Sequence, residues 1–139
     1  NDMQDMLFDL QEEFHKKFVF ISHDIDEALK LGDKIAILKD GKMDQEGIPA
    51  EIILKPKTEY VRKFVEDVNR TRVLKAKHIM ENINGINTNG AMLVNQEDFL
   101  EKFMEKFVQV KPENILVQDD RKNNKGVITS KRLSEILRK

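Results

Sequence analysis

One stretch decides the fold of this chain: KFVFISHDIDEALKLGDKIAILKDGKMDQEG, residues 17–47. It opens with four consecutive apolar residues, 18–21, which are aromatic or β-branched and predict a strand buried on both faces, as in a parallel sheet. Asp24 and Glu27 have the spacing of a capping box, which predicts that a helix begins there and can end at Gly32. A buried strand followed directly by a helix indicates the α/β class.

The second half of the stretch predicts a β-hairpin. The apolar run 35–38 is followed by Asp40-Gly41, and this dipeptide is favoured where both central turn residues need a positive φ. Beyond the hairpin, Pro49 suits the first turn of a short helix, and Thr58 can begin another.

One histidine, His23, stands between the predicted strand and the predicted helix. In open α/β sheets this edge is where ligands bind, and a histidine there can donate a hydrogen bond to an anion or transfer a proton near neutral pH. A lone histidine at such a place is also an ordinary turn residue. The residues alone leave both interpretations open.

Upstream of the stretch, residues 2–16 predict an amphipathic helix with one apolar face. Downstream, residues 66–78 are charged, with few apolar side chains, and predict a solvated connector. The alternative for this segment is a contact with anionic lipid, because it carries a basic cluster: Arg70, Arg72, Lys75, Lys77 and His78.

From residue 79 the pattern changes to short apolar runs separated by Asn and Gly turns. It predicts the order β-α-β-β-α. The predicted elements are a strand over 91–94, a helix over 96–108, strands over 115–117 and 126–129, and a last helix capped by Ser130. The helix over 96–108 carries two apolar stripes, which predict core packing and a partner helix in addition.

Composition excludes several classes of function. The 139 residues are 35% charged but balanced to a formal net charge of -1, which gives no reason to expect nucleic-acid binding. There are no cysteines, the three histidines show no metal-ligand spacing, and no apolar run approaches the ~20 residues that cross a bilayer.

Two longer segments resemble a known family. FISHDIDEALKLGDKIAILKDGKMDQEGIPAEIILKP and EYVRKFVEDVNRTRVLKAKHIM are similar to the C-terminal part of ABC transporter ATP-binding subunits of the glycine betaine/proline importer type. The resemblance implies that His23 contacts the γ-phosphate of ATP and helps to hold the hydrolytic water. It also implies ATP and Mg in the parent protein, a transmembrane permease, a second ATPase subunit as homodimer, and indirectly an osmolyte-binding protein. The implied location is cytoplasmic, peripheral on the inner face of the membrane.

The sequence also departs from that family. It contains no Gly-x-x-x-x-Gly-Lys-Ser/Thr phosphate loop, signature loop or acidic strand with a catalytic glutamate. Because backbone N–H groups of the phosphate loop cradle the phosphates, we expect that this chain alone does not hydrolyse ATP. It is expected to be a fragment of a longer protein or a remnant without ATPase activity.

The C-terminal stretch ILVQDDRKNNKGVITSKRLSEIL resembles one CBS domain. CBS domains work in pairs that bind adenosine-containing ligands, which implies an adenine nucleotide and makes Thr129 a candidate ligand residue. Arg132 stands where that family has a ribose-binding aspartate. An arginine cannot accept from ribose hydroxyls but can pair with a phosphate. Thr129 is equally well explained as an ordinary helix-start residue.

The sequence therefore predicts three parts: residues 1–67 as the C-terminal part of an ABC ATPase domain, 68–78 as a linker, and 79–139 as a small α+β CBS-like module. The parent function implied is ATP-driven import of glycine betaine, proline or choline-type osmolytes. One alternative is a non-catalytic regulatory and dimerisation module that senses a nucleotide or ionic strength. Another is a degenerate product that folds only in part.

Overall fold

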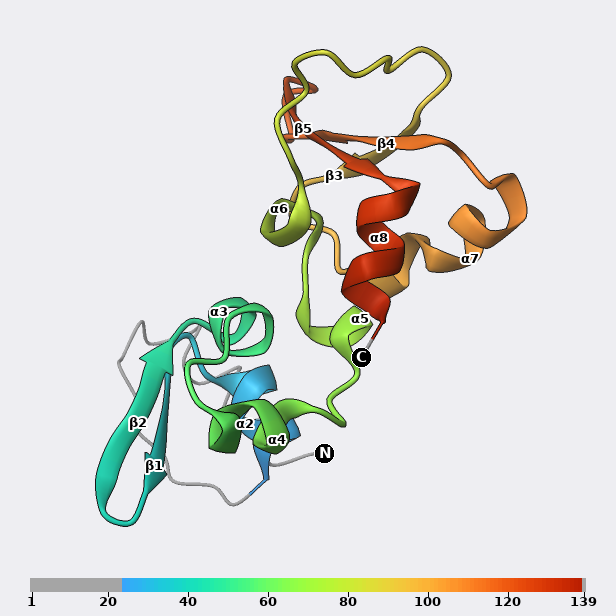
Figure 1. Cartoon of the computed structure of the whole chain (residues 1–139). Helices are drawn as coiled ribbons and strands as arrows, with labels where there is room; N and C mark the ends of the chain where they lie inside the picture. The colour runs from blue at the N-terminus through green and yellow to red at the C-terminus, as the bar shows by residue number, and fades with distance from the viewer. Residues whose placement is uncertain (1–23, 139) are drawn as a thin grey trace. The chain divides into compact units, whose positions relative to one another are not determined.

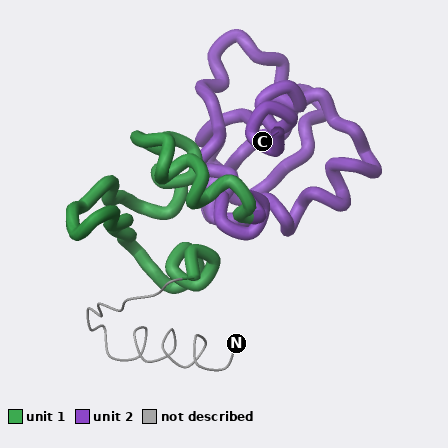
Figure 2. The backbone as a smooth tube through the Cα atoms, turned by 60° about the horizontal axis from the view of Figure 1, so that its bottom comes forward, with its two compact units in different colours: residues 1–68 green, residues 69–139 purple. Residues whose placement is uncertain are grey.

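The computed structural model describes residues 24–138, and the chain divides into two units, residues 1–68 and residues 69–139 (Figure 2). Both units combine helices with a sheet, which confirms the predicted α/β class. The predicted helix over 2–16, the predicted strand over 18–21 and His23 lie outside the described residues.

The first described element is α2, Ile25–Leu31, and it begins where the sequence predicts. The Asp24 carboxylate accepts the N–H groups of Asp26 at 3.0 Å and Glu27 at 3.4 Å. These contacts satisfy two donors that the helix itself cannot pair. Gly32 ends the helix with an ordinary φ of -83°, and a Cβ there would come within 2.9 Å of a backbone oxygen.

The predicted hairpin is also confirmed. Strand β1, Ile35–Lys39, pairs antiparallel with β2, Lys42–Gly47 (Figure 1). Asp40 and Gly41 adopt φ values of 52° and 76°, the two positive angles that the tight turn requires.

Two short helices complete unit 1: α3, Pro49–Leu54, and α4, Glu59–Val65. Pro49 occupies the first turn of α3, and the Thr58 hydroxyl caps α4 by accepting the Val61 N–H at 3.1 Å. Both starts agree with the sequence prediction. The core that these elements share includes fully buried Ile52 and Val61.

Strand β2 holds the connection between α3 and α4 through a buried polar side chain. Gln45, 4% exposed, donates from Nε2 to the Lys55 carbonyl at 3.1 Å and accepts the Lys57 N–H at Oε1 at 2.8 Å. Next to it, the Thr58 hydroxyl donates to the Asp44 carboxylate at 2.6 Å. The turn after α3 is therefore fixed by side chains rather than by a backbone ladder.

Unit 2 has the predicted β-α-β-β-α order, preceded by two helical turns. Its elements are α5 Arg70–Val73, α6 Ala76–Ile79, β3 Met92–Asn95, α7 Leu100–Val110, β4 Asn114–Gln118, β5 Asn124–Thr129 and α8 Ser130–Leu137. The sheet order is β3-β4-β5, with β3 parallel to β4 and β4 antiparallel to β5. Helices α6, α7 and α8 lie on one side of this sheet (Figure 1).

The core of unit 2 lies between the sheet and these helices. Its fully buried side chains come from β4, β5, α6, α7 and α8: Ile115, Val117, Val127, Ile128, Ile79, Leu100 and Leu133. Only part of the apolar surface predicted around α7 is buried in this core. Phe103 is buried, whereas Phe99, Val108 and Val110 are exposed.

Two predicted boundaries in unit 2 are wrong. Helix α7 begins at Leu100 rather than at residue 96, because the side chains of Asn95 and Asp98 form a turn first. Asn95 Oδ1 accepts the Glu97 N–H at 2.8 Å, and Asp98 accepts the Asn95 N–H at 3.1 Å. Helix α8 is capped by Thr129, and not by Ser130.

The segment predicted as a linker, residues 68–78, is folded and not a bare connector. Residues 69–78 belong to unit 2, and within them Leu74 and Ala76 are fully buried. The N–H of Ala76 donates to the Asp98 carbonyl at 2.9 Å, and that of Leu100 donates to the Leu74 carbonyl at 2.9 Å. A few apolar residues with backbone contacts to α7 are enough to order a charged segment.

Candidate functional site

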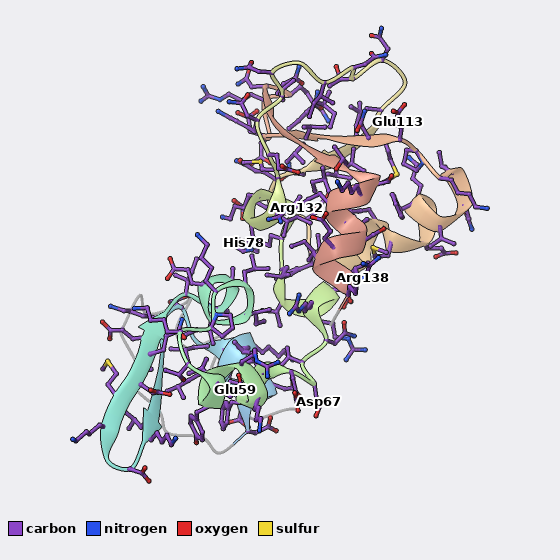
Figure 3. All side chains as sticks on the ribbon, viewed as in Figure 1. Glu59, Asp67, His78, Glu113, Arg132 and Arg138 are labelled. Carbon is purple, nitrogen blue, oxygen red and sulfur yellow. The ribbon has the colours of Figure 1, made fainter. Side chains whose placement is uncertain are left out.

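The structure describes one of the two sites that the sequence predicts. His23 lies outside the described residues. Thr129 and Arg132 are brought together at the end of β5, where α8 begins. Figure 3 shows Arg132 on the first turns of α8. Strand β5 runs into α8 without a loop, because Thr129 is both its last residue and the cap of the helix.

The Thr129 hydroxyl is used first for helix capping. Its Oγ1 accepts the Arg132 N–H at 3.0 Å, which satisfies a donor of the first turn. A hydroxyl has two lone pairs and one O–H, so the O–H of Thr129 is still able to donate to a ligand oxygen. The capping role and a binding role are therefore compatible.

The Arg132 side chain is held by one hydrogen bond from its guanidinium group. Its Nε donates to the carbonyl of Ile79, the last residue of α6, at 3.2 Å. The guanidinium carries five donors, so four N–H groups remain on its terminal nitrogens. Within residues 24–138 the Arg132 guanidinium forms no ion pair. It is thus a partly oriented cation beside the helix start, suited to a phosphate group.

The basic side chains of the predicted linker, in contrast, form ion pairs and hydrogen bonds with other residues of unit 2. Lys75 and Lys77 both bind the Glu97 carboxylate, at 3.1 and 2.7 Å, and hydrogen bonding from Lys77 lowers the pKa of Glu97. Arg72 pairs with Glu101 at 3.5 Å. Arg70 donates to the Ile136 carbonyl of α8 at 2.7 Å. These pairings favour a structural role over the lipid contact.

His78 has a structural contact of its own. Its Nδ1 accepts the Lys75 N–H at 3.0 Å and so supports the start of α6. Burial lowers the pKa of His78 below its ordinary value, and the cations of Lys77 and Lys75 lower it further. The neutral ring is the form that can accept this hydrogen bond.

Within residues 24–138, no group of three or more His, Cys, Asp or Glu side chains is placed to hold a metal ion. The sequence contains no Gly-x-x-x-x-Gly-Lys-Ser/Thr pattern. In the same residues no helix is long and apolar enough to cross a membrane.

The partners of Arg132 and of Lys77 could not be predicted from the sequence. Nothing in the sequence pairs Arg132 with Ile79, which precedes it by 53 positions, or Lys77 with Glu97, which follows it by 20. These contacts depend on how α6 packs beside α7 and α8. An isolated glutamate between Gln and Asp carried no signal that it would bind two lysines.

Comparison with known proteins shows that the chain is similar to ATP-binding subunits of ABC transporters, several of them named for the transport of glycine betaine or trimethylamine N-oxide. No protein-family model matches the chain. The match to these subunits falls on the C-terminal part of the ATPase, so the predicted resemblance to this class is confirmed.

Three relatives illustrate the match. The glycine betaine transport ATP-binding protein OpuAA of Bacillus subtilis is 54% identical over 80 residues, which are 58% of this chain and 19% of that protein. The trimethylamine N-oxide transport system ATP-binding protein TmoW of Pelagibacter ubique is 44% identical over 126 residues, 91% of this chain and 36% of that protein. The glycine betaine/proline betaine transport system ATP-binding protein ProV of Escherichia coli is 46% identical over 78 residues, 56% of this chain and 20% of that protein.

The chain thus spans between about a fifth and about a third of the length of these curated relatives. The match to TmoW covers 91% of the chain and therefore includes residues of both units.

Proposed function

We propose that this chain is the C-terminal portion of the ATP-hydrolysing subunit of an ABC importer for glycine betaine, proline or choline-type osmolytes. The observation that carries the proposal is the match to TmoW, which runs through both units at 44% identity. The relatives' names cite glycine betaine, proline betaine and trimethylamine N-oxide, which are all small, zwitterionic or strongly dipolar solutes. The substrate class proposed follows from that shared chemistry.

The proposal includes the rest of the machinery. In the parent protein ATP and Mg are used, with a second ATPase subunit as homodimer and a transmembrane permease, and an osmolyte-binding protein acts indirectly. The subunit is cytoplasmic and peripheral on the inner face of the membrane. Residues 1–67 belong to the ATPase domain and residues 79–139 form a CBS-like module, with residues 69–78 folded into the same unit. This chain alone does not hydrolyse ATP.

The test of the ATPase proposal is His23→Ala in the intact parent protein. We expect most of the ATP turnover to be lost while ATP affinity is largely kept, because the phosphate loop supplies the affinity. His15→Ala is the matched control and should leave turnover unchanged. Near-normal turnover in the His23 variant would remove His23 from the mechanism. A parent reading frame without a phosphate loop would remove the ATPase proposal itself.

A second candidate is a non-catalytic regulatory module that senses a nucleotide. The specific observation in its favour is the Thr129–Arg132 site, where a free O–H and a partly oriented guanidinium lie at one helix start. This pair suits a ligand with a phosphate and a neighbouring acceptor. The exposed apolar side chains of Phe99, which precedes α7, and of Val108 and Val110 in α7 support self-association of the same unit.

The test of the second candidate uses the 139-residue protein as it is. ATP, ADP, AMP and a cyclic dinucleotide are added in turn while amide NMR shifts are followed. We expect shifts that centre on Thr129 and Arg132 and disappear in Arg132→Gln. Arg138→Gln is the control, since that exposed cation lies at the other end of α8 (Figure 3). Unchanged spectra with all four nucleotides would refute the nucleotide site.

A further inference from the structure

The segment between α6 and β3 contains a short sequence repeat. The pattern Asn-x-Asn-Gly occurs twice in succession, over residues 82–85 and 87–90. Both copies fold in the same way. In each, the side-chain oxygen of the first asparagine accepts the N–H of the second asparagine at 3.0 Å.

A β-turn follows in each copy. Its closing hydrogen bond runs from the Ile86 N–H to the Ile83 carbonyl, 3.0 Å, and from the Ala91 N–H to the Thr88 carbonyl, 3.1 Å. The glycine at the third turn position has a φ of +79° in one copy and +73° in the other, as a type II turn requires. The two copies are therefore structural equivalents.

The two asparagines of each copy differ in what their side chains do. The first is engaged, because its oxygen closes the side-chain turn. The second, Asn84 or Asn89, is exposed, and its side-chain amide makes no hydrogen bond within residues 24–138. The residue that follows it is glycine. A Cβ built on Gly85 or Gly90 would meet no atom within 4 Å, so the space around this peptide is open.

We propose that Asn84 and Asn89 are sites of spontaneous deamidation through a cyclic imide. The backbone nitrogen of the following glycine loses its proton and attacks the carbonyl carbon of the asparagine amide. The new bond between that nitrogen and that carbon closes a five-membered ring, and the bond from the carbon to the amide nitrogen breaks as ammonia leaves. Water then opens the ring at either carbonyl and gives aspartate or isoaspartate. Ammonia out and water in balance the step, and one negative charge is gained per site.

The open surroundings favour this reaction at two positions and disfavour it at their neighbours. In the described residues, no hydrogen bond holds the N–H of Gly85 or Gly90, so this nitrogen is available to attack. Asn82 and Asn87 are followed by branched residues, Ile83 and Thr88, whose side chains crowd the backbone nitrogen. Their own amides are also held in the side-chain turns.

The fold of unit 2 does not rest on the two reactive side chains. The segment is anchored at its start and in its middle by other groups. Glu81 pairs with Val127 in a backbone bridge, and Asn114 Nδ2 donates to the Asn87 carbonyl at 2.9 Å. Conversion of both sites would change the formal net charge from -1 to -3 with these anchors in place.

The experiment incubates the folded 139-residue protein at mildly alkaline and at mildly acidic pH and maps the products by peptide mass spectrometry. We expect species about 1 Da heavier per site, the difference between an amide NH₂ and a carboxylic OH. The added mass should map to Asn84 and Asn89, with isoaspartate identified by electron-transfer fragmentation. Alkaline pH should speed the reaction, because the attacking nitrogen must lose a proton.

The internal comparison is with the other asparagines of the protein. Asn84 and Asn89 should convert at least about tenfold faster than Asn82 and Asn87, a difference of about 1.4 kcal/mol in activation free energy. The double variant Asn84→Ser/Asn89→Ser should abolish the heavier species, whereas Asn82→Ser/Asn87→Ser should keep them. The proposal is overturned if the folded protein stays unmodified at both sites over a time in which the denatured protein reacts, or if Asn82 and Asn87 convert equally fast.

Discussion

Replacement of Gln45 by alanine should destabilise unit 1 far more than the size of the side chain implies. Gln45 is nearly inaccessible and makes two hydrogen bonds to the backbone between α3 and α4, one as donor and one as acceptor. Alanine leaves the Lys55 carbonyl and the Lys57 N–H without these partners. An unpaired buried polar group costs about 1–3 kcal/mol. Since the turn is only partly buried and water can reach part of it, we expect a loss of about 2–4 kcal/mol in the free energy of unfolding.

The sequence offers a clean assay for this loss. It has one tyrosine, Tyr60 in α4, and no tryptophan, so tyrosine fluorescence during denaturation reports on unit 1. The matched control is Glu46→Ala, the next residue of β2. Its side chain is 48% exposed and pairs with Lys34 at 3.4 Å, a surface contact worth about 0–1 kcal/mol. If Gln45→Ala costs no more than Glu46→Ala, the argument from buried hydrogen bonds fails.

A third variant separates the donor from the acceptor. Gln45→Glu keeps an oxygen for the Lys57 N–H but replaces the donor to the Lys55 carbonyl with a carboxylate oxygen. Burial beside a carbonyl raises the folded-state pKa of such a glutamate above its unfolded value. The folded state then binds more protons, so this variant should gain stability as pH falls, relative to Gln45→Ala. An identical pH dependence in the two variants would contradict the assigned donor role.

Two further predictions concern unit 2. Gly126→Ala should lower the free energy of unfolding of unit 2 by about 1–3 kcal/mol, because the new Cβ would come within 2.7 Å of the Met80 sulfur and force repacking. Amide NMR during denaturation measures this loss. An unchanged stability would show that the Met80 side chain moves aside freely. His78 should make unit 2 less stable in acid, because its pKa in the folded state lies below the unfolded value of about 6.5. The contribution of the neutral His78 ring to stability is therefore complete above that pH and is lost as pH falls through the folded pKa. His78→Gln, which can still accept the Lys75 N–H, should flatten this dependence, and an unchanged acid response would assign it to other groups.

Local elements of this fold were predictable where one or two residues settle the backbone. Asp40-Gly41 could form only a tight turn with two positive φ values, and the structure has both. Pro49 and Thr58 marked the starts of α3 and α4. A proline, which lacks an N–H, is tolerated in the first turn of a helix, and a threonine hydroxyl is favoured as the helix cap. The order of strands and helices along unit 2 followed from apolar runs separated by turns.

What the sequence could not supply depends on contacts between distant residues. The predicted start of α7 lay four residues too far toward the N-terminus, since apolar spacing does not reveal that Asn95 and Asp98 close a turn. The segment 68–78 looked solvated because its charge is high, yet Leu74 is fully buried. Likewise Thr129 and Arg132 were singled out from a family pattern, while the anchoring carbonyl of Ile79 appears only in three dimensions.

The boundary of sequence similarity and the boundary of folding do not coincide in this protein. A match of 80 residues in a sequence of 139, such as the one to OpuAA, must include residues 60–80 wherever it begins. Helices α5 and α6 therefore belong to the part shared with relatives that match little more than half of the sequence. By folding, however, they belong to unit 2, where Arg70 holds the end of α8 and Ile79 holds Arg132. The segment shared with the ATPase relatives thus contributes helices α5 and α6 to the fold of the second unit. A unit built in this way cannot be separated at residue 79, where the composition changes, without removing the buried Leu74 and Ala76 from its own core.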